Sequence, residues 1–218
     1  MITLTDIKKI MPSLKENWIN PGPNGRLRWK DRDTWQSVFL ERETMMSMLE
    51  IINGLENVSD MTVVDAGCEA GLFSVILSQK FKKVIAIDSD ETSIINAKKT
   101  LKIFDSFGFD ISNIEVIHDN FNEQRTLLEY DAILMVDGFG TASVIPFFKR
   151  NKDILSKVKM FIRTDREDFQ ISLEEQEEYI KELRKKYKEF NFNLTEYKTM
   201  KHCRRADAFV GRKNETNI

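Results

Sequence analysis

The stretch from Thr62 to Asp90, TVVDAGCEAGLFSVILSQKFKKVIAIDSD, decides the fold of this chain. Two β-branched valines follow the first threonine, as in a strand that is buried on both faces. Glycines then break the chain, and the apolar run from Leu72 to Leu77 predicts a helix packed on a sheet. A second apolar run over residues 84–87 ends at Asp88. The stretch therefore predicts a strand–helix–strand unit with a right-handed crossover.

The turn between the first strand and the helix has the features of a cofactor site. Ligands of open α/β sheets bind outside the carboxyl ends of the strands. Gly67 removes a Cβ where a ligand approaches the backbone or where φ is positive, and Gly71 lets the helix lie close to the strand. Asp88 ends the second strand, where an acid can accept hydrogen bonds from both hydroxyls of a ribose. These features predict a cofactor that carries a nucleoside.

The glycine spacing disfavours a dinucleotide. A G-x-G-x-x-G fingerprint that starts at Gly67 requires glycine at positions 69 and 72. The chain has Glu69 and Leu72 there, and the Glu69 carboxylate would repel a pyrophosphate. A nicotinamide-dependent oxidoreductase is therefore a weak alternative.

Residues 65–71, DAGCEAG, resemble the first motif of class I S-adenosylmethionine-dependent methyltransferases. Asp65, Gly67 and Gly71 match that motif, Glu69 stands where its middle glycine is common, and Asp88 matches the family's ribose-binding acid. The resemblance covers residues 60–213. It implies an α/β fold, a three-layer αβα sandwich around a seven-stranded, mostly parallel sheet with an antiparallel last strand. It also implies S-adenosyl-L-methionine as the cofactor and S-adenosyl-L-homocysteine as its product.

The resemblance also implies a set of cofactor-binding residues. In the family an acid after the third strand meets the adenine amino group, and a neighbouring apolar side chain packs on the ring; Asp119 and Phe121 fit these roles. The Glu69 side chain either hydrogen-bonds the amino-acid end of the cofactor or points to solvent. The full predicted set is Asp65, Gly67, Cys68, Glu69, Gly71, Asp88, Ser89, Asp119, Asn120, Phe121 and Asp137.

The later chain continues to alternate strands and helices. Apolar segments predict strands over residues 113–117, 130–138 and 158–162. Two last strands, over 192–197 and 208–210, have no helix between them, which predicts an antiparallel pair at a sheet edge. In the family the fourth strand lies beside the first, and its end faces the methyl group. Asp137 ends that strand and is the candidate catalytic residue, as base or orienter; the alternative is that it makes a turn or touches the cofactor.

The N-terminal region predicts helices in front of this domain. Residues 1–20 predict one broken or two short helices, capped at Thr5 and interrupted at Pro12. A second helix is predicted from Thr34 to a closing Gly54. We expect residues 1–58 to form a helical extension or substrate lid, and residues 59–218 to form the methyltransferase domain.

Composition limits the remaining classes of function. The chain has 218 residues, 41% of them hydrophobic, and a net charge of −2, so no global field favours nucleic acid. Two cysteines and two histidines disfavour a disulfide scaffold and a metal centre. The sequence has no apolar run of transmembrane length and no signal-peptide core, so we expect a cytoplasmic protein without membrane contact.

Two basic stretches, over residues 26–32 and 198–205, suggest where a substrate binds. Basic residues beside aromatics hold phosphates and stack bases, but they also bind a single anionic molecule. We expect a methyl acceptor that is a small polar or anionic molecule, modified on O or N. The alternatives are an RNA methyltransferase and a non-catalytic methyltransferase-like binding module. The predicted substrate residues are Trp29, Arg32, Asp165, Arg166 and His202.

Overall fold

The computed structural model describes residues 1–18, 43–124, 127–135, 152–166, 191–198 and 206–213, with isolated helical residues between 178 and 189. Within these residues the elements follow one another as α1 (Leu4–Asn17), α3 (Glu43–Gly54), β1 (Thr62–Ala66), α4 (Leu72–Ser78), β2 (Lys83–Asp88), α5 (Glu91–Ser106), β3 (Ile114–His118), α6 (Phe121–Gln124), β4 (Ala132–Met135), α8 (Lys152–Lys157), β5 (Met160–Arg166), β6 (Phe192–Lys198) and β7 (Ala206–Lys213).

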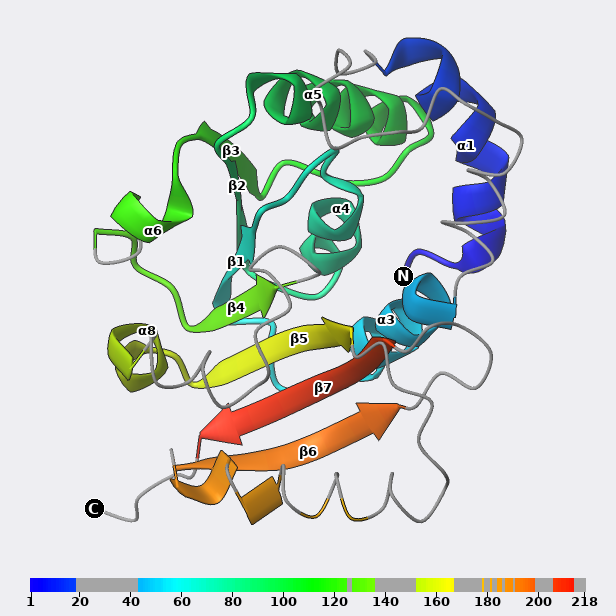
Figure 1. The fold of residues 1–218 in the computed structure, drawn as a ribbon. Helices are drawn as coiled ribbons and strands as arrows, with labels where there is room; N and C mark the ends of the chain where they lie inside the picture. Colours follow the sequence, from blue (N-terminus) through cyan, green and yellow to red (C-terminus); the bar gives the residue numbers. More distant parts are fainter. Residues whose placement is uncertain are drawn as a thin grey trace.

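The strands form one sheet in the order β3-β2-β1-β4-β5-β7-β6 (Figure 1). β1 pairs in parallel with β2 and β4, and the pairs β2–β3 and β4–β5 are also parallel. β7 runs antiparallel to both of its neighbours, β5 and β6. The predicted seven-stranded sheet with an antiparallel last strand is confirmed, and so is the position of the fourth strand beside the first.

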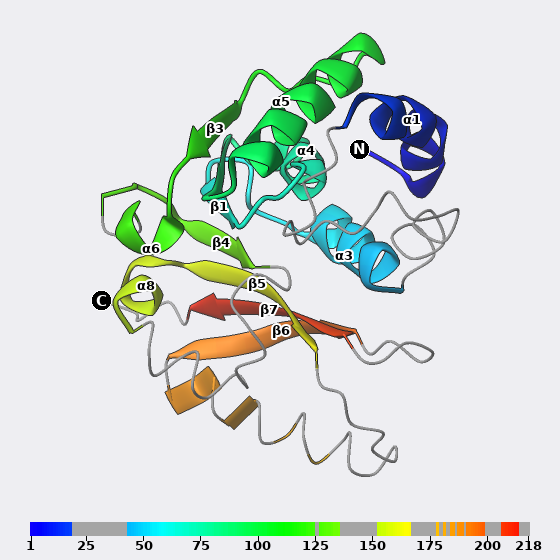
Figure 2. The same ribbon diagram turned by 45° about the horizontal axis from the view of Figure 1, so that its top comes forward.

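The strands bury side chains on both faces, because successive side chains of a strand point to opposite sides. Val63 of β1 joins a core formed with α1, α3, α4 and α5, whereas the next residue, Val64, joins a second core on the other face. That second core includes Phe121 of α6 and Ile154 of α8. Figures 1 and 2 show α1, α3, α4 and α5 on one side of the sheet and α8 on the other, which gives the three predicted layers.

The first helix differs from its prediction. α1 is continuous and contains Pro12, and its cap is Thr3, whose hydroxyl accepts from the Asp6 amide in a capping box. A proline in a helix removes one backbone hydrogen bond. Burial of the apolar stripe offsets that loss, since Ile7, Ile10, Met11 and Leu14 are buried in the core that α1 shares with α3, α4 and α5. The predicted break at Pro12 and cap at Thr5 are therefore wrong. None of the described helices is long and apolar enough to cross a membrane.

The last three strands are longer than the apolar pattern predicts. β5 extends to Arg166, and its final residues Asp165 and Arg166 pair with β7. Backbone pairing with a neighbouring strand does not depend on side-chain polarity, so a polar strand end carries no apolar signal. The predicted helix that begins at Thr34 starts outside the described residues. The division of the chain at residues 58 and 59 stays a prediction.

Candidate cofactor site

The turn after β1 has three residues in the left-handed region. Gly67 has φ 73°, Gly71 has φ 74°, and Glu69 between them has φ 47°. Glycine adopts this region without a steric penalty, whereas a residue with a Cβ pays roughly 1–2 kcal/mol. The glycines therefore allow the turn, and Glu69 occupies a conformation that glycine would adopt more easily.

Backbone hydrogen bonds fix this turn against the end of β2. The amides of Gly67 and Cys68 both donate to the Ile87 carbonyl, at 2.9 and 3.1 Å. The Glu69 amide donates to Asp88 Oδ2 at 2.9 Å. The turn and the acid that the sequence singled out separately therefore form one structural unit at the carboxyl edge of the sheet.

Asp88 joins the loops that follow three strands. Its Oδ1 accepts from the Asp90 amide at 2.9 Å, in addition to the bond from Glu69. Its backbone carbonyl accepts from the Asp119 amide at 3.0 Å, which holds the loop after β3. A carboxylate offers about four acceptor positions, of which these amides use two. The half-buried Asp88 side chain keeps acceptor capacity for two hydroxyl donors.

Asp65 lies beneath the turn and is buried, with only 3% of the residue exposed. Ser74 of α4, which is fully buried, donates its hydroxyl to Asp65 Oδ2 at 2.5 Å. Burial raises the pKa of Asp65 to about 7; the nearby Asp88 also raises it, and the bond from Ser74 acts in the opposite direction. Burial likewise raises the pKa of the Cys68 thiol well above its usual value, so Cys68 is a neutral thiol.

Gly71 meets a different neighbour from the one predicted. A Cβ at Gly71 would lie 3.1 Å from the Ala97 Cβ and 3.3 Å from the Ala97 Cα. Ala97 belongs to α5, so the absence of a side chain at Gly71 lets the turn pack against that helix. The predicted close approach is real, but the neighbour is α5 and not the strand.

The loop after β3 places the remaining predicted cofactor residues. Asp119 Oδ1 accepts from the Asn120 amide and Oδ2 accepts from Gln124 Nε2, both at 2.6 Å. Phe121 is only 5% exposed, and its ring lies 6.3 Å from that of Tyr130, in the core. Ser89 is exposed in the loop after β2, and its carbonyl lies 3.2 Å from His118 Nε2. The roles of Asp119, Asn120 and Phe121 toward adenine stay predictions.

The predicted catalytic and substrate residues are located only in part. Asp137, Trp29, Arg32 and His202 lie outside the described residues. Asp165 and Arg166 are at the carboxyl end of β5, on the same edge of the sheet as the glycine turn. The sequence interpretation missed Ser74. The available signal was a single polar residue inside the apolar run from Leu72 to Leu77.

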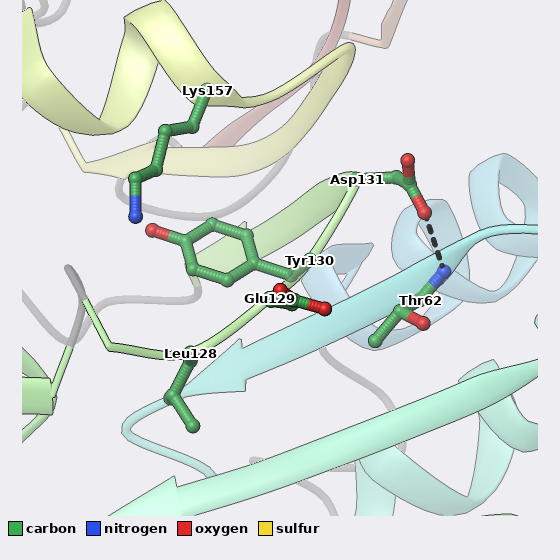
Figure 3. A pocket seen from close by; sticks show the side chains of 6 residues that line it. All are labelled: Thr62, Leu128, Glu129, Tyr130, Asp131 and Lys157. Atoms are coloured by element: carbon green, nitrogen blue, oxygen red, sulfur yellow. Dashed lines mark hydrogen bonds between the residues drawn. The ribbon is translucent and has the colours of Figure 1, made fainter.

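An open pocket of about 410 Å³ lies at the amino ends of the strands, at the edge of the sheet opposite to the glycine turn (Figure 3). Its lining includes Thr62, the first residue of β1, and Asp131, which directly precedes β4. The Thr62 amide donates to Asp131 Oδ2 at 3.0 Å, and the side chains of Tyr130 and Lys157 point toward one another in Figure 3. These are the amino ends of the strands, so the pocket is remote from the glycine turn and from Asp88.

Comparisons with solved structures identify the fold. Magnesium protoporphyrin IX methyltransferase from Synechocystis PCC 6803, with bound S-adenosylmethionine, matches with a TM-score of 0.61 and 14% identity over 86% of this chain and 93% of that chain. A candidate RNA methyltransferase from Pyrococcus horikoshii matches with a TM-score of 0.55 and 16% identity over 100% of both chains. Precorrin-6y C5,15-methyltransferase from Geobacter metallireducens GS-15 matches with a TM-score of 0.53 and 10% identity over 78% of this chain and 89% of that one.

No protein-family model matches the sequence of this chain, and no curated protein sequence matches it significantly. The chain thus has the Rossmann-like αβα fold of the class I S-adenosylmethionine-dependent methyltransferases.

Proposed function

We propose that this protein is an S-adenosylmethionine-dependent methyltransferase that modifies O or N of a small polar or anionic molecule. One observation carries the proposal. In the glycine turn the Glu69 amide donates to the Asp88 carboxylate, and the Asp90 amide donates to its other oxygen. Two of the about four acceptor positions of Asp88 therefore remain for the two hydroxyls of a ribose. The fold supports the proposal, because a methyltransferase solved with bound S-adenosylmethionine matches this chain with a TM-score of 0.61.

The residues of the turn fit S-adenosylmethionine better than a dinucleotide. Asp65, Glu69 and Asp88 gather three carboxyl groups around Cys68, and all three raise the pKa of its thiol. S-adenosylmethionine carries a positive sulfonium, a positive ammonium and one carboxylate, so its net charge is positive and this environment attracts it. A pyrophosphate is negative and would be repelled by the same groups.

When bound, the cofactor supplies an activated methyl group on a good leaving group. The chain has to bind the acceptor, hold its nucleophilic atom in line at roughly 3–3.5 Å from the methyl carbon, and exclude water. A base is required only where that atom carries a proton of high pKa. We assign the role of base or orienter to Asp137. Asp165 and Arg166 stand at the same edge of the sheet and are the substrate residues that we propose from β5, together with Trp29, Arg32 and His202.

Isothermal titration calorimetry tests the proposed cofactor. The protein is titrated with S-adenosylmethionine, S-adenosylhomocysteine and, as the control, NAD. We expect micromolar binding of the first two ligands and none of NAD. Binding of NAD alone would replace the proposal with a dinucleotide-dependent function. No binding of any ligand would favour a non-catalytic module in which Glu69 blocks the turn.

An RNA methyltransferase is the second candidate, because the candidate RNA methyltransferase of Pyrococcus horikoshii matches this chain over its full length. Phosphate contacts release counterions, so a true RNA complex weakens steeply as salt increases. Filter binding with bulk RNA between 50 and 200 mM salt separates the two candidates. A salt-sensitive complex favours RNA as the acceptor, and the absence of binding at both salt concentrations favours a small molecule.

A further inference from the structure

We propose that Ser74 is a positioning residue for the cofactor site, and that the Ser74–Asp65 pair couples cofactor binding to the release of one proton. This inference rests on the proposed function and extends it to a residue that has no access to the cofactor. Ser74 is fully buried in α4.

Geometry identifies Ser74 as the residue that fixes the Asp65 carboxylate. The hydroxyl donates to Asp65 Oδ2 at 2.5 Å, and both side chains are buried. Asp65 is the second-last residue of β1, and the glycine turn begins two residues after it. A hydrogen bond to a carboxylate favours its ionised form and fixes its orientation. Ser74 therefore favours the ionised form of the acid under the turn and fixes its orientation.

The surroundings of Asp65 oppose ionisation until a cation arrives. Burial raises its pKa to about 7, and Asp88 at the end of β2 adds to the effect. The neighbouring groups of the turn are the Glu69 carboxyl and the Cys68 thiol, which is neutral because burial, Asp65, Asp88 and Glu69 all raise its pKa. Near neutral pH the Asp65 carboxyl is therefore protonated in part of the molecules.

Binding of a cation beside Asp65 selects the ionised form. The O–H bond of the Asp65 carboxyl breaks, its electron pair stays on the carboxylate, and the proton goes to the solvent. Affinity for a cationic cofactor consequently falls as pH decreases through the pKa of the free protein. With a pKa of about 7, the ionised fraction is about one tenth at pH 6 and nine tenths at pH 8, so affinity is about tenfold higher at pH 8.

Calorimetry across pH tests the proposal with three variants. S-adenosylmethionine affinity is measured from pH 6 to pH 8.5 for the wild type, Ser74→Ala, Asp65→Asn and the control Ser78→Ala. Ser78 is a second buried serine of α4, and its hydroxyl donates to the Val75 carbonyl at 2.8 Å, away from Asp65. Thermal melts at each pH confirm that every variant is folded.

We expect Ser74→Ala to shift the pH midpoint upward and to weaken binding about tenfold at pH 7, since a hydrogen bond to a charged group is lost. Asp65→Asn should bind weakly and without pH dependence, and Ser78→Ala should match the wild type. In buffers of different ionisation enthalpy, the wild type should release about three quarters of a proton per cofactor at pH 6.5, given a pKa of about 7.

Each alternative result is decisive. A wild type that binds S-adenosylmethionine with the same affinity at pH 6 and pH 8 overturns the proton coupling and leaves the proposed function standing. An unchanged midpoint in folded Ser74→Ala overturns the positioning role. Absence of binding at every pH overturns the proposed function itself, and this inference with it. The Asp65 carboxyl resonance, followed by carbon NMR in the free protein, gives an independent check of the wild-type midpoint and of its upward shift in Ser74→Ala.

Discussion

Replacement of Gly71 by alanine tests how tightly the glycine turn is built against α5. Two separate effects oppose a side chain at this position. With φ at 74°, alanine pays roughly 1–2 kcal/mol for the left-handed backbone. The new Cβ would also lie 3.1 Å from the Ala97 Cβ, and such overpacking costs about 1–3 kcal/mol. We expect Gly71→Ala to lower the free energy of unfolding by about 2–5 kcal/mol in total.

Gly108→Ala is the matched control for the backbone effect. Gly108 has φ 85°, but a Cβ there would meet no atom within 4 Å. The free energy of unfolding of Gly108→Ala should therefore fall by only about 1–2 kcal/mol, which is the backbone part of the loss in Gly71→Ala. Urea unfolding followed by circular dichroism measures both variants against the wild type. Equal losses for the two variants would refute the close packing of the turn on α5.

A second variant separates packing from other causes. Ala97→Gly in the Gly71→Ala background removes the closest atom, the Ala97 Cβ. The double-mutant cycle should then give a favourable coupling of about 1 kcal/mol. Zero coupling would mean that the loss in Gly71→Ala comes from the backbone alone.

Two further predictions concern stability. Gly211→Ala on β7 should destabilise the protein by at least about 2 kcal/mol in urea, because a Cβ there would lie 2.2 Å from two atoms of the Phe161 ring; a loss under 0.5 kcal/mol would contradict this contact. Asp131 contributes a small pH dependence: burial raises its pKa, but the hydrogen bonds from Lys159 and from the Thr62 amide outweigh burial and lower it overall. The ionised form is therefore favoured by folding, so this stabilisation is complete at neutral pH and is lost as pH falls through the acid range; Asp131→Asn should remove this part of the acid dependence. Lys159 Nζ lies 2.8 Å from Asp131 Oδ1, and 66% of the lysine side chain is exposed. This ion pair should therefore contribute no more than about 1 kcal/mol to the free energy of unfolding, as measured by thermal melts.

The sequence predicted the elements whose apolar residues face a core. β1, α4 and β2 follow the apolar runs of the opening stretch closely. Such segments have a strong periodic pattern, because burial and periodicity have the same cause.

Long-range contacts explain what the sequence did not predict. α1 continues through Pro12 because the apolar side of the helix is buried in the core on one face of the sheet, and no local sequence pattern predicts that burial. The approach of Gly71 to Ala97 joins residues of two helices, and the bond from Ser74 to Asp65 crosses between α4 and β1. The glycine motif therefore predicted the position of the turn, whereas the residues that hold the turn are identified only by the packed structure.

The most direct test of the central claim is the affinity of Asp88→Ala for S-adenosylmethionine. Asp90→Ala is the control, since Asp90 has the same charge in the same loop but uses its carboxylate on the Ser93 amide. Two charge-assisted hydrogen bonds to ribose hydroxyls are worth about 3 kcal/mol together, so we predict binding about 100-fold weaker in Asp88→Ala. Asp90→Ala should bind within about threefold of the wild type. An affinity of folded Asp88→Ala equal to that of the wild type would contradict the assignment of the cofactor site to the turn after β1 and the end of β2.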